Sequence, residues 1–187
     1  MNPSIPLLSL LSLLLLSSLP SSLSSNPSTT QTTTPLDHLC NNLGGFYITP
    51  DYCFTTFAAD SRSHTADYNL LALICLNLTI SNATDVKSTI NSMLTSSTFS
   101  SSTPSSEPVH KGLQTCFKLY DDVIASLRWS AQSVSAGRYD GAKEVVEQAV
   151  GVPASCDAMP GLPLSKENDG FSRIALLSQA VVSYLAN

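Results

Sequence analysis

Four stretches of the chain repeat apolar residues at steps of three and four positions, which is the spacing of one face of an α-helix. Polar segments or segments rich in glycine and proline separate them, and alternating strand patterns are nearly absent. We therefore predict an all-α fold, an antiparallel up-and-down four-helix bundle over residues 65–187. The four predicted helices cover residues 65–94, 107–136, 140–149 and 165–184.

Polar residues and glycines mark the ends of these helices. Thr65 and Asp140 are the predicted N-caps of the first and third helices, and Gly137 ends the second. Residues 95–106 are almost entirely Ser and Thr, so they are expected to connect the first helix to the second.

The chain before the bundle divides into three segments. Residues 5–19 form a leucine-rich run of about 15 residues, shorter than the roughly 20 that cross a bilayer. This run predicts a signal peptide over residues 1–24, and the alternative is an uncleaved membrane anchor. Residues 25–36 are rich in Ser, Thr and Pro and predict a disordered lead-in. Residues 37–64, with two cysteines around a turn, are expected to be attached to one end of the bundle.

Composition narrows the classes of function. The chain has 187 residues, a length that suits one domain, and a formal net charge of −5 without a cluster of basic residues. Such an acidic chain is a poor candidate for binding nucleic acid, and no membrane contact is expected once the signal peptide is removed. The 3 histidines show no metal-ligand spacing and no cofactor motif occurs, so we expect neither a metal nor a cofactor.

The five cysteines become candidate disulfide partners if the chain is secreted. Cys116 and Cys156 each lie about 20 residues from the turn at Gly137, so antiparallel helices bring them level. Cys75 is out of level with Cys116 by about 16 Å, beyond the roughly 7 Å between Cα atoms that a disulfide spans. We therefore predict the pairs Cys40–Cys53 and Cys116–Cys156, with Cys75 as a free thiol inside the bundle.

Two acceptor sequences for N-linked glycosylation agree with the secretory route. They are Asn77-Leu78-Thr79 and Asn82-Ala83-Thr84, both within the first predicted bundle helix. A site on the buried face of that helix would stay unmodified.

The chain shows none of the short motifs of serine hydrolases, zinc proteases or nucleotide-binding loops. The three histidines, His38, His64 and His110, are expected near helix ends in contact with solvent. Cys75 has the apolar neighbours Ile74 and Leu78 in its predicted helix, where a thiol behaves as a small hydrophobe rather than a nucleophile. We therefore expect a protein that is not an enzyme and whose function resides in a surface.

Several short motifs, taken in order with the cysteine spacing, resemble the plant invertase and pectin methylesterase inhibitor family. The likeness runs from about residue 37 to the C-terminus. It implies a four-helix bundle with an N-terminal helical hairpin, secreted to the apoplast and cell wall or to the vacuole. It also implies that the protein inactivates an enzyme there by forming a stoichiometric complex. The motifs are Asp51-Tyr52-Cys53, Ser63-His64-Thr65-Ala66-Asp67, Gln114-Thr115-Cys116, Ser155-Cys156-Asp157 and Ser165-Lys166-Glu167-Asn168.

The resemblance also suggests a target-binding segment. Invertase inhibitors of the family resemble one another in blocking the substrate pocket with a bundle loop that carries Pro-Lys-Phe or a similar triplet. The corresponding turn here is Gly137-Arg138-Tyr139, which keeps the cation and the aromatic residue. Arg138 would enter a pocket lined by the two carboxylates of a glycosidase, while Tyr139 stacks like a sugar. The alternative is an ordinary helix end with a solvated arginine.

Three hypotheses of function remain. The leading one is a secreted inhibitor of plant acid invertase, a β-fructofuranosidase. The second is an inhibitor of pectin methylesterase, which in this family is covered by polar faces of the bundle. The third is a non-inhibitory secreted binding domain on the same scaffold, because residues 95–106 and 157–158 depart from the family pattern.

Overall fold

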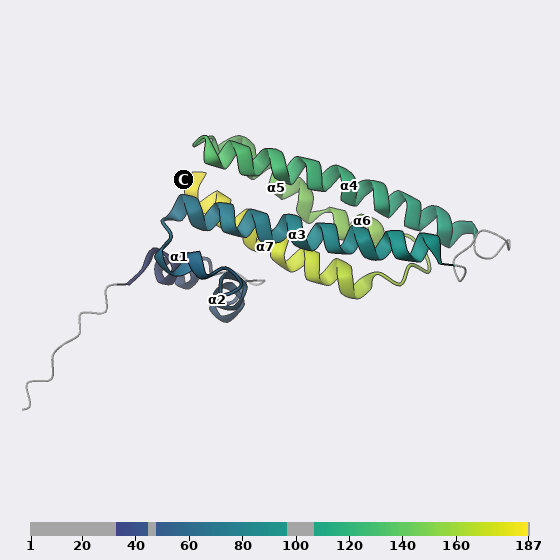
Figure 1. Cartoon of the computed structure of the whole chain (residues 1–187), viewed down its shortest axis with the longest axis horizontal. Helices are drawn as coiled ribbons and strands as arrows, with labels where there is room; N and C mark the ends of the chain where they lie inside the picture. The colour runs from purple at the N-terminus through teal and green to yellow at the C-terminus, as the bar shows by residue number, and fades with distance from the viewer. Residues whose placement is uncertain (1–32, 45–47, 97–106, 187) are drawn as a thin grey trace, which may run out of the picture. The chain divides into compact units, whose positions relative to one another are not determined.

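The computed structural model describes residues 33–44, 48–96 and 107–186. Three long helices and a pair of consecutive shorter helices form an antiparallel bundle, and two further short helices lie beside it (Figure 1). This arrangement confirms the predicted all-α, four-helix bundle fold. The elements in chain order are α1 (Pro35–Asn42), α2 (Pro50–Phe57), the 3-10 helix η2 (Ser61–Thr65), α3 (Tyr68–Thr95), α4 (Glu107–Ser135), α5 (Tyr139–Val150), α6 (Val152–Asp157) and α7 (Ser165–Ala186).

The predicted signal peptide over residues 1–24 lies outside the described residues, as does the lead-in up to residue 32. The predicted end of that lead-in at residue 36 is wrong, because α1 begins at Pro35 and Leu36 is buried. Thr34 and Asp37 cap this helix reciprocally. The Thr34 hydroxyl accepts a hydrogen bond from the Asp37 N–H at 3.1 Å, and the Asp37 carboxylate accepts one from the Thr34 N–H at 2.9 Å. These hydrogen bonds lower the pKa of Asp37.

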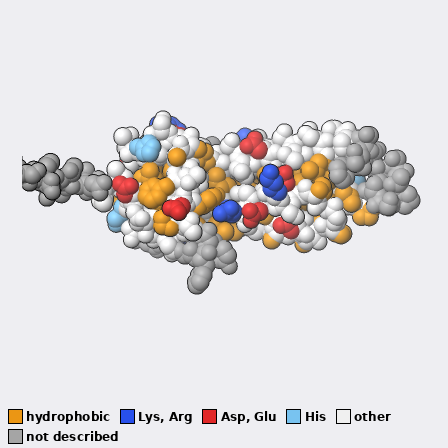
Figure 2. Space-filling model, turned by 90° about the horizontal axis from the view of Figure 1, so that it is seen from below, with side chains coloured by type: hydrophobic (Ala, Val, Ile, Leu, Met, Phe, Trp, Pro, Cys, Tyr) orange, Lys and Arg blue, Asp and Glu red, His pale blue; other side chains and the backbone are white. Residues whose placement is uncertain are grey.

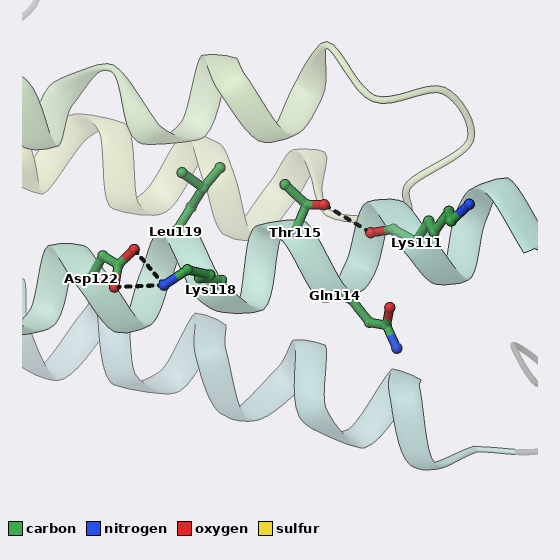
Figure 3. A pocket seen from close by; sticks show the side chains of 6 residues that line it. All are labelled: Lys111, Gln114, Thr115, Lys118, Leu119 and Asp122. Atoms are coloured by element: carbon green, nitrogen blue, oxygen red, sulfur yellow. Dashed lines mark hydrogen bonds and ion pairs between the residues drawn. The ribbon is translucent and has the colours of Figure 1, made fainter.

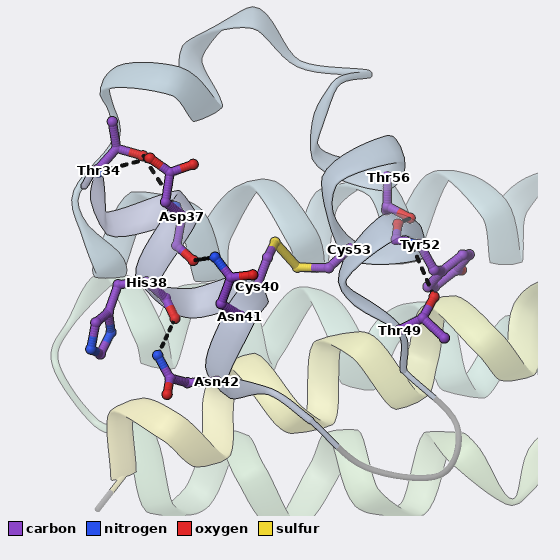
Figure 4. Close-up of a disulfide and its surroundings, with 10 residues drawn as sticks. All are labelled: Thr34, Asp37, His38, Cys40, Asn41, Asn42, Thr49, Tyr52, Cys53 and Thr56. Carbon is purple, nitrogen blue, oxygen red and sulfur yellow. Dashed lines mark hydrogen bonds between the residues drawn. A yellow bond between two sulfur atoms is a disulfide. The ribbon is translucent and has the colours of Figure 1, made fainter. Parts of the chain in front are cut away.

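A disulfide closes the hairpin of α1 and α2 (Figure 4). It joins Cys40 to Cys53, as predicted, with their Cα atoms 5.5 Å apart. Thr49 caps α2 by accepting a hydrogen bond from the Tyr52 N–H at 3.2 Å. Two helices of 8 residues bury little apolar surface by themselves, so the crosslink supplies part of the stability that a larger core would give.

Two aromatic contacts dock this hairpin on the bundle. On α1, the His38 ring lies against Tyr68 and Tyr184, and its Nδ1 is 3.1 Å from the Tyr184 hydroxyl. On α2, the Tyr52 ring receives the guanidinium of Arg173 at 4.9 Å from its centroid. Residues from α3 and α7 therefore hold both halves of the hairpin.

The start of α3 differs from the prediction. Thr65 is the last residue of η2 rather than an N-cap, and Asp67 takes the capping position. The Asp67 carboxylate accepts a hydrogen bond from the Leu70 N–H at 2.8 Å. The sequence contains both a Thr and an Asp within three positions, and the preceding 3-10 turn decides between them.

The helix α3 is the central element of the bundle, packed between α4 and α7 (Figure 1). By length and composition it is apolar enough to span a bilayer, but its apolar side chains fill the core. Tyr120 of α4 and Phe171 of α7 meet in this core edge to face, with ring centroids 5.2 Å apart. Other fully buried large side chains are Leu71, Ile74, Leu76, Ile90, Leu113, Leu127 and Leu177.

The second disulfide joins α4 to α6. Cys116 and Cys156 have Cα atoms 5.5 Å apart, as the comparison of helix levels predicted. Tyr120 and Asp157 lie close to the two cysteines of this disulfide in sequence. The buried Tyr120 hydroxyl donates a hydrogen bond to Asn168 Oδ1 at 2.8 Å, and Asn168 Nδ2 donates one to Asp157 at 2.6 Å. Burial raises the pKa of Tyr120. This chain of side chains ties α4, α7 and α6 together at one end of the bundle.

Cys75 is the free cysteine of the described residues and lies fully buried in α3. Its sulfur accepts a hydrogen bond from the Ser178 hydroxyl at 3.1 Å. Burial raises the pKa of Cys75 to about 12. The thiol therefore stays protonated at any physiological pH, which is the behaviour of a structural cysteine rather than a nucleophile.

Candidate functional site

The turn between α4 and α5 has a fixed backbone. Gly137 adopts a positive φ of 71°, and its N–H donates to the Val134 carbonyl at 2.9 Å. The Arg138 N–H donates to the Ser133 carbonyl, also at 2.9 Å. These two bonds form a Schellman motif, which ends α4 and defines the direction in which the chain leaves it. Gly137 thus ends the helix as predicted.

Arg138 stands on this turn with its side chain in solvent. It occupies the N-cap position of α5, whose first residue is Tyr139, so the predicted cap at Asp140 is wrong. Among the described residues, the Arg138 guanidinium has no hydrogen-bond or ion-pair partner. A shallow groove beside it is lined by residues 137–141 and Ala186. The cation is therefore available to a carboxylate from another protein.

Tyr139 does not stand free next to Arg138. Its ring is partly buried, and its hydroxyl accepts a hydrogen bond from Asn69 Nδ2 at 2.9 Å. The same Nδ2 donates to the Val134 carbonyl at 3.1 Å. In the free protein Tyr139 is therefore an anchor that joins the turn to α3, whereas the sequence suggested an exposed stacking ring.

Trp129 is a surface residue that the sequence analysis did not single out. Its side chain is 47% exposed, and among the described residues it is the one large hydrophobic side chain that is exposed. Its indole lies over Gly141 in the first turn of α5, where a Cβ atom would come within 3.2 Å of the ring. A glycine inside a helix costs about 1 kcal/mol relative to alanine, and here it makes room for the indole.

Trp129, Arg138, Asp140 and Gly141 together make up what we call the turn surface. Trp and Arg are the residue types that most often dominate the energy of protein–protein interfaces. The sequence offered one signal for this surface, a lone tryptophan in a polar stretch of α4 at a distance of nine residues from the arginine. Only the packing of α4 against α5 places the two on neighbouring elements.

A second groove, of about 320 Å³, runs along α4 nearer its start (Figure 3). Its charged side chains are paired, since Lys118 lies 3.2 Å from Asp122 within the groove and Lys111 lies 3.7 Å from Glu107 outside it. The groove is lined by Lys111, Gln114, Thr115, Lys118, Leu119 and Asp122. It is an open groove between polar and charged residues, floored by their aliphatic parts and Leu119, rather than a closed catalytic cleft.

The remaining predicted residues are spread over several elements. His38 lies on α1, His64 on η2 and His110 on α4, where Gln114 is its neighbour at 3.1 Å. The described residues contain no group of three or more His, Cys, Asp or Glu side chains that could hold a metal. On the face drawn in Figure 2, acidic and basic side chains are scattered along the bundle with apolar side chains between them.

The two predicted glycosylation sites differ in exposure. Asn77 is exposed on α3, while Asn82, one and a half turns further along, is partly buried. The hydroxyl of Thr79 is buried and lies 2.7 Å from the Ser178 hydroxyl, whereas Thr84 is exposed. Neither site lies on the fully buried face of the helix.

Comparison with known proteins now adds to this geometry. The family model for "Plant invertase/pectin methylesterase inhibitor" matches residues 34–175. The chain belongs to the plant invertase/pectin methylesterase inhibitor family. That match spans the hairpin, both disulfides and most of the bundle.

Two relatives within this family carry a more specific name. A protein of Platanus acerifolia named "Putative invertase inhibitor" is 26% identical over 141 residues, which cover 72% of this chain and 75% of the relative. A protein of Platanus orientalis with the same name is 25% identical over 141 residues, covering 72% and 79%. The family description and these names support an inhibitor of invertase or of pectin methylesterase. The two disulfides are typical of proteins that fold outside the cytosol.

Proposed function

We propose that this protein is a secreted inhibitor of plant acid invertase and that it binds the enzyme through the turn surface. The observation that carries the proposal is the solvent-exposed guanidinium of Arg138, which has no partner among the described residues and stands on a turn with a fixed backbone. Glycosidases place two carboxyl groups around the bond they cleave, and an arginine fork can bind such carboxylates with two parallel hydrogen bonds.

The scaffold lowers the cost of presenting Arg138. The Schellman motif fixes the backbone on one side of the residue, and the Asn69–Tyr139 hydrogen bond fixes it on the other. A binding segment that is already ordered loses less conformational entropy when the complex forms. Trp129 would then pack against the rim of the enzyme's pocket while Arg138 enters it, so that substrate is excluded.

Inhibition of pectin methylesterase is the second candidate, and the groove in Figure 3 favours it. The family resemblance implies that polar faces of the bundle cover this enzyme. The α4 face around Lys111 and Lys118 carries polar and charged residues, is open and lies far from the turn surface. About 20 residues separate Lys118 from Arg138 along the chain, which corresponds to roughly 30 Å of helix. Substitutions on the turn surface and substitutions on this α4 face therefore test the two candidate targets separately.

We place the protein in the apoplast and cell wall, with the vacuole as the alternative, because the family acts on enzymes of these compartments. The depressed pKa values of Asp37, Asp60 and Asp121 keep these carboxylates ionised in a mildly acidic compartment. Their hydrogen bonds to Thr34, Arg62 and Lys87 are therefore retained there.

The direct test is a titration of purified protein against acid invertase and, separately, against pectin methylesterase at acidic pH. We expect invertase activity to fall in proportion to added protein until the two are equimolar. Loss of pectin methylesterase activity instead would establish the second candidate. If a several-fold molar excess leaves both enzymes fully active, the inhibitor proposal is wrong and a non-inhibitory binding domain on this scaffold is favoured.

A further inference from the structure

A groove of about 260 Å³ lies where the hairpin meets the bundle, between α2, α3 and α7. It has both polar and apolar walls, as a sugar-binding surface does, because hydroxyls and a carboxylate can bond sugar hydroxyls while aliphatic side chains contact the ring. The walls include Thr55, Thr56, Leu78, Asn82, Asp85 and Ile174.

The side-chain amide of Asn82 lies in the wall of this groove. Its Oδ1 is fully buried and receives no hydrogen bond from a described residue. Asn82 as a whole is only partly buried and lines the groove, so part of the residue borders the open space. A buried carbonyl oxygen without a donor is unfavourable, and a group that entered the groove with a donor could relieve that cost.

We propose that Asn82 carries an N-linked glycan whose first sugar occupies this groove. The residue begins the acceptor sequence Asn82-Ala83-Thr84, and Nδ2 is the atom that the modification uses. Transfer forms a bond between Nδ2 and the anomeric carbon of N-acetylglucosamine and breaks the bond from that carbon to a phosphate oxygen of a lipid-diphosphate donor. The amide loses one proton, and the diphosphate leaves with the electron pair of the broken bond.

The glycan at this position would link two parts of the fold. Thr55 and Thr56 belong to α2, while Asn82 and Asp85 belong to α3. A sugar between them adds contacts where the hairpin is held to the bundle by the Tyr52–Arg173 pair. Its expected effect is therefore slower local opening of the hairpin, seen as slower amide hydrogen exchange in α2.

Asn77 provides an internal control. It is exposed on the same helix, and the structure gives it no place among the walls of the groove. A glycan on Asn77 would project into solvent, so its removal should leave the exchange of the hairpin amides unchanged.

The proposal rests on secretion of the chain, not on the identity of the target enzyme. The test expresses the full chain in plant cells and measures glycan occupancy by peptide mass spectrometry and hydrogen exchange of α2. Thr84→Ala removes the acceptor sequence without touching Asn82, and Thr84→Ser keeps it. We expect α2 amides to exchange about fivefold or more faster in Thr84→Ala, with wild-type rates in Thr84→Ser and in Asn77→Gln. Trimming the glycan to its first sugar should leave the exchange slow.

The possible outcomes distinguish failure of this inference from failure of the proposed function. A glycan on Asn77 with residue 82 bare would overturn this inference alone. Bare asparagines at both positions would overturn the inference without bearing on secretion, which detection of the chain in the culture medium tests separately. Full occupancy of Asn82 with equal exchange in Thr84→Ala and Thr84→Ser would show that the glycan does not use the groove. Invertase inhibition, read on the same samples, tests the proposed function independently.

Discussion

Asn69 at the start of α3 donates a hydrogen bond to the hydroxyl of Tyr139 at the start of α5, across 2.9 Å. The two residues are 70 positions apart in sequence. The same amide nitrogen also reaches the last turn of α4 through the Val134 carbonyl. One asparagine therefore holds three helices in register around the turn that presents Arg138.

Replacing Asn69 with alanine should weaken both stability and inhibition. The change leaves the Tyr139 hydroxyl and the Val134 carbonyl without this donor, which predicts a loss of about 1–3 kcal/mol in unfolding free energy. Tyr139→Phe removes one of the two bonds and should cost about 0.5–1.5 kcal/mol. Urea unfolding of both single variants and the double variant measures the coupling between the residues. Strictly additive losses would show that the hydrogen bond does not contribute.

Reversing the charge of Arg138 should weaken invertase inhibition at least about tenfold, because a glutamate would meet the carboxylates of the enzyme's pocket. The matched control is Lys166→Glu, which makes the same charge change on an exposed residue at the far end of α7. Inhibition constants at one ionic strength compare the two variants. Equal potency of Arg138→Glu and Lys166→Glu would move the interface away from the turn surface.

Trp129→Ala should reduce inhibition without unfolding the protein. The indole is 47% exposed and covers Gly141, so its removal opens no cavity inside the core. An interface tryptophan commonly contributes about 2 kcal/mol or more, which corresponds to a loss of roughly thirtyfold in affinity. Isothermal titration with invertase measures the change, and circular dichroism confirms the fold. A variant that binds as tightly as the wild type would exclude Trp129 from the interface.

The bundle could be predicted from the sequence because its helices follow a clear apolar period and its turns contain glycine and proline. The pair Cys116–Cys156 could also be predicted by comparing the positions of the cysteines along antiparallel helices. That comparison needs only the rise per residue and the position of one turn. It holds although α6 is a separate short helix, because α6 continues the direction of α5.

The details of the site could not be predicted in the same way. Local patterns favoured Thr65 as a cap and Tyr139 as an exposed ring, but tertiary contacts decide both positions. The pairing of Asn69 with Tyr139 depends on which helix faces which, and no local signal encodes it. Asp157, noted as a departure from the family pattern, accepts a hydrogen bond from the buried Asn168 and so has a structural role.

The cysteine arrangement predicts a specific pattern of thiol labelling. An alkylating reagent should leave the folded protein unmodified, because Cys75 is fully buried and the other cysteines are bonded. One label should appear, on Cys75, after unfolding in denaturant without reductant. Peptide mapping of the labelled protein identifies the site, and reduction beforehand serves as the control with five labels. A peptide joining residue 75 to residue 116 would contradict the topology.

The stability of the fold should fall at alkaline pH, and Cys75 should account for the onset. Burial raises its pKa from the ordinary value of 9.0 to about 12, so between these values the unfolded chain releases a proton that the folded protein keeps. The unfolding free energy is therefore unaffected by this group below about pH 9 and decreases above it, by up to about 1.4 kcal/mol for each pH unit. Tyr120, whose pKa burial also raises, adds to the decrease above about pH 10.

Cys75→Ala separates the two contributions, since alanine has no proton to lose. Its unfolding free energy should be lower at neutral pH because of the missing sulfur, but flat up to about pH 10, where tyrosine ionisation begins. Urea unfolding at intervals from pH 7 to 10.5, completed quickly enough to keep the disulfides intact, gives both curves. If the two proteins lose stability in parallel from pH 9 upward, the thiol does not cause the onset, and the ionisation of another group would have to explain it.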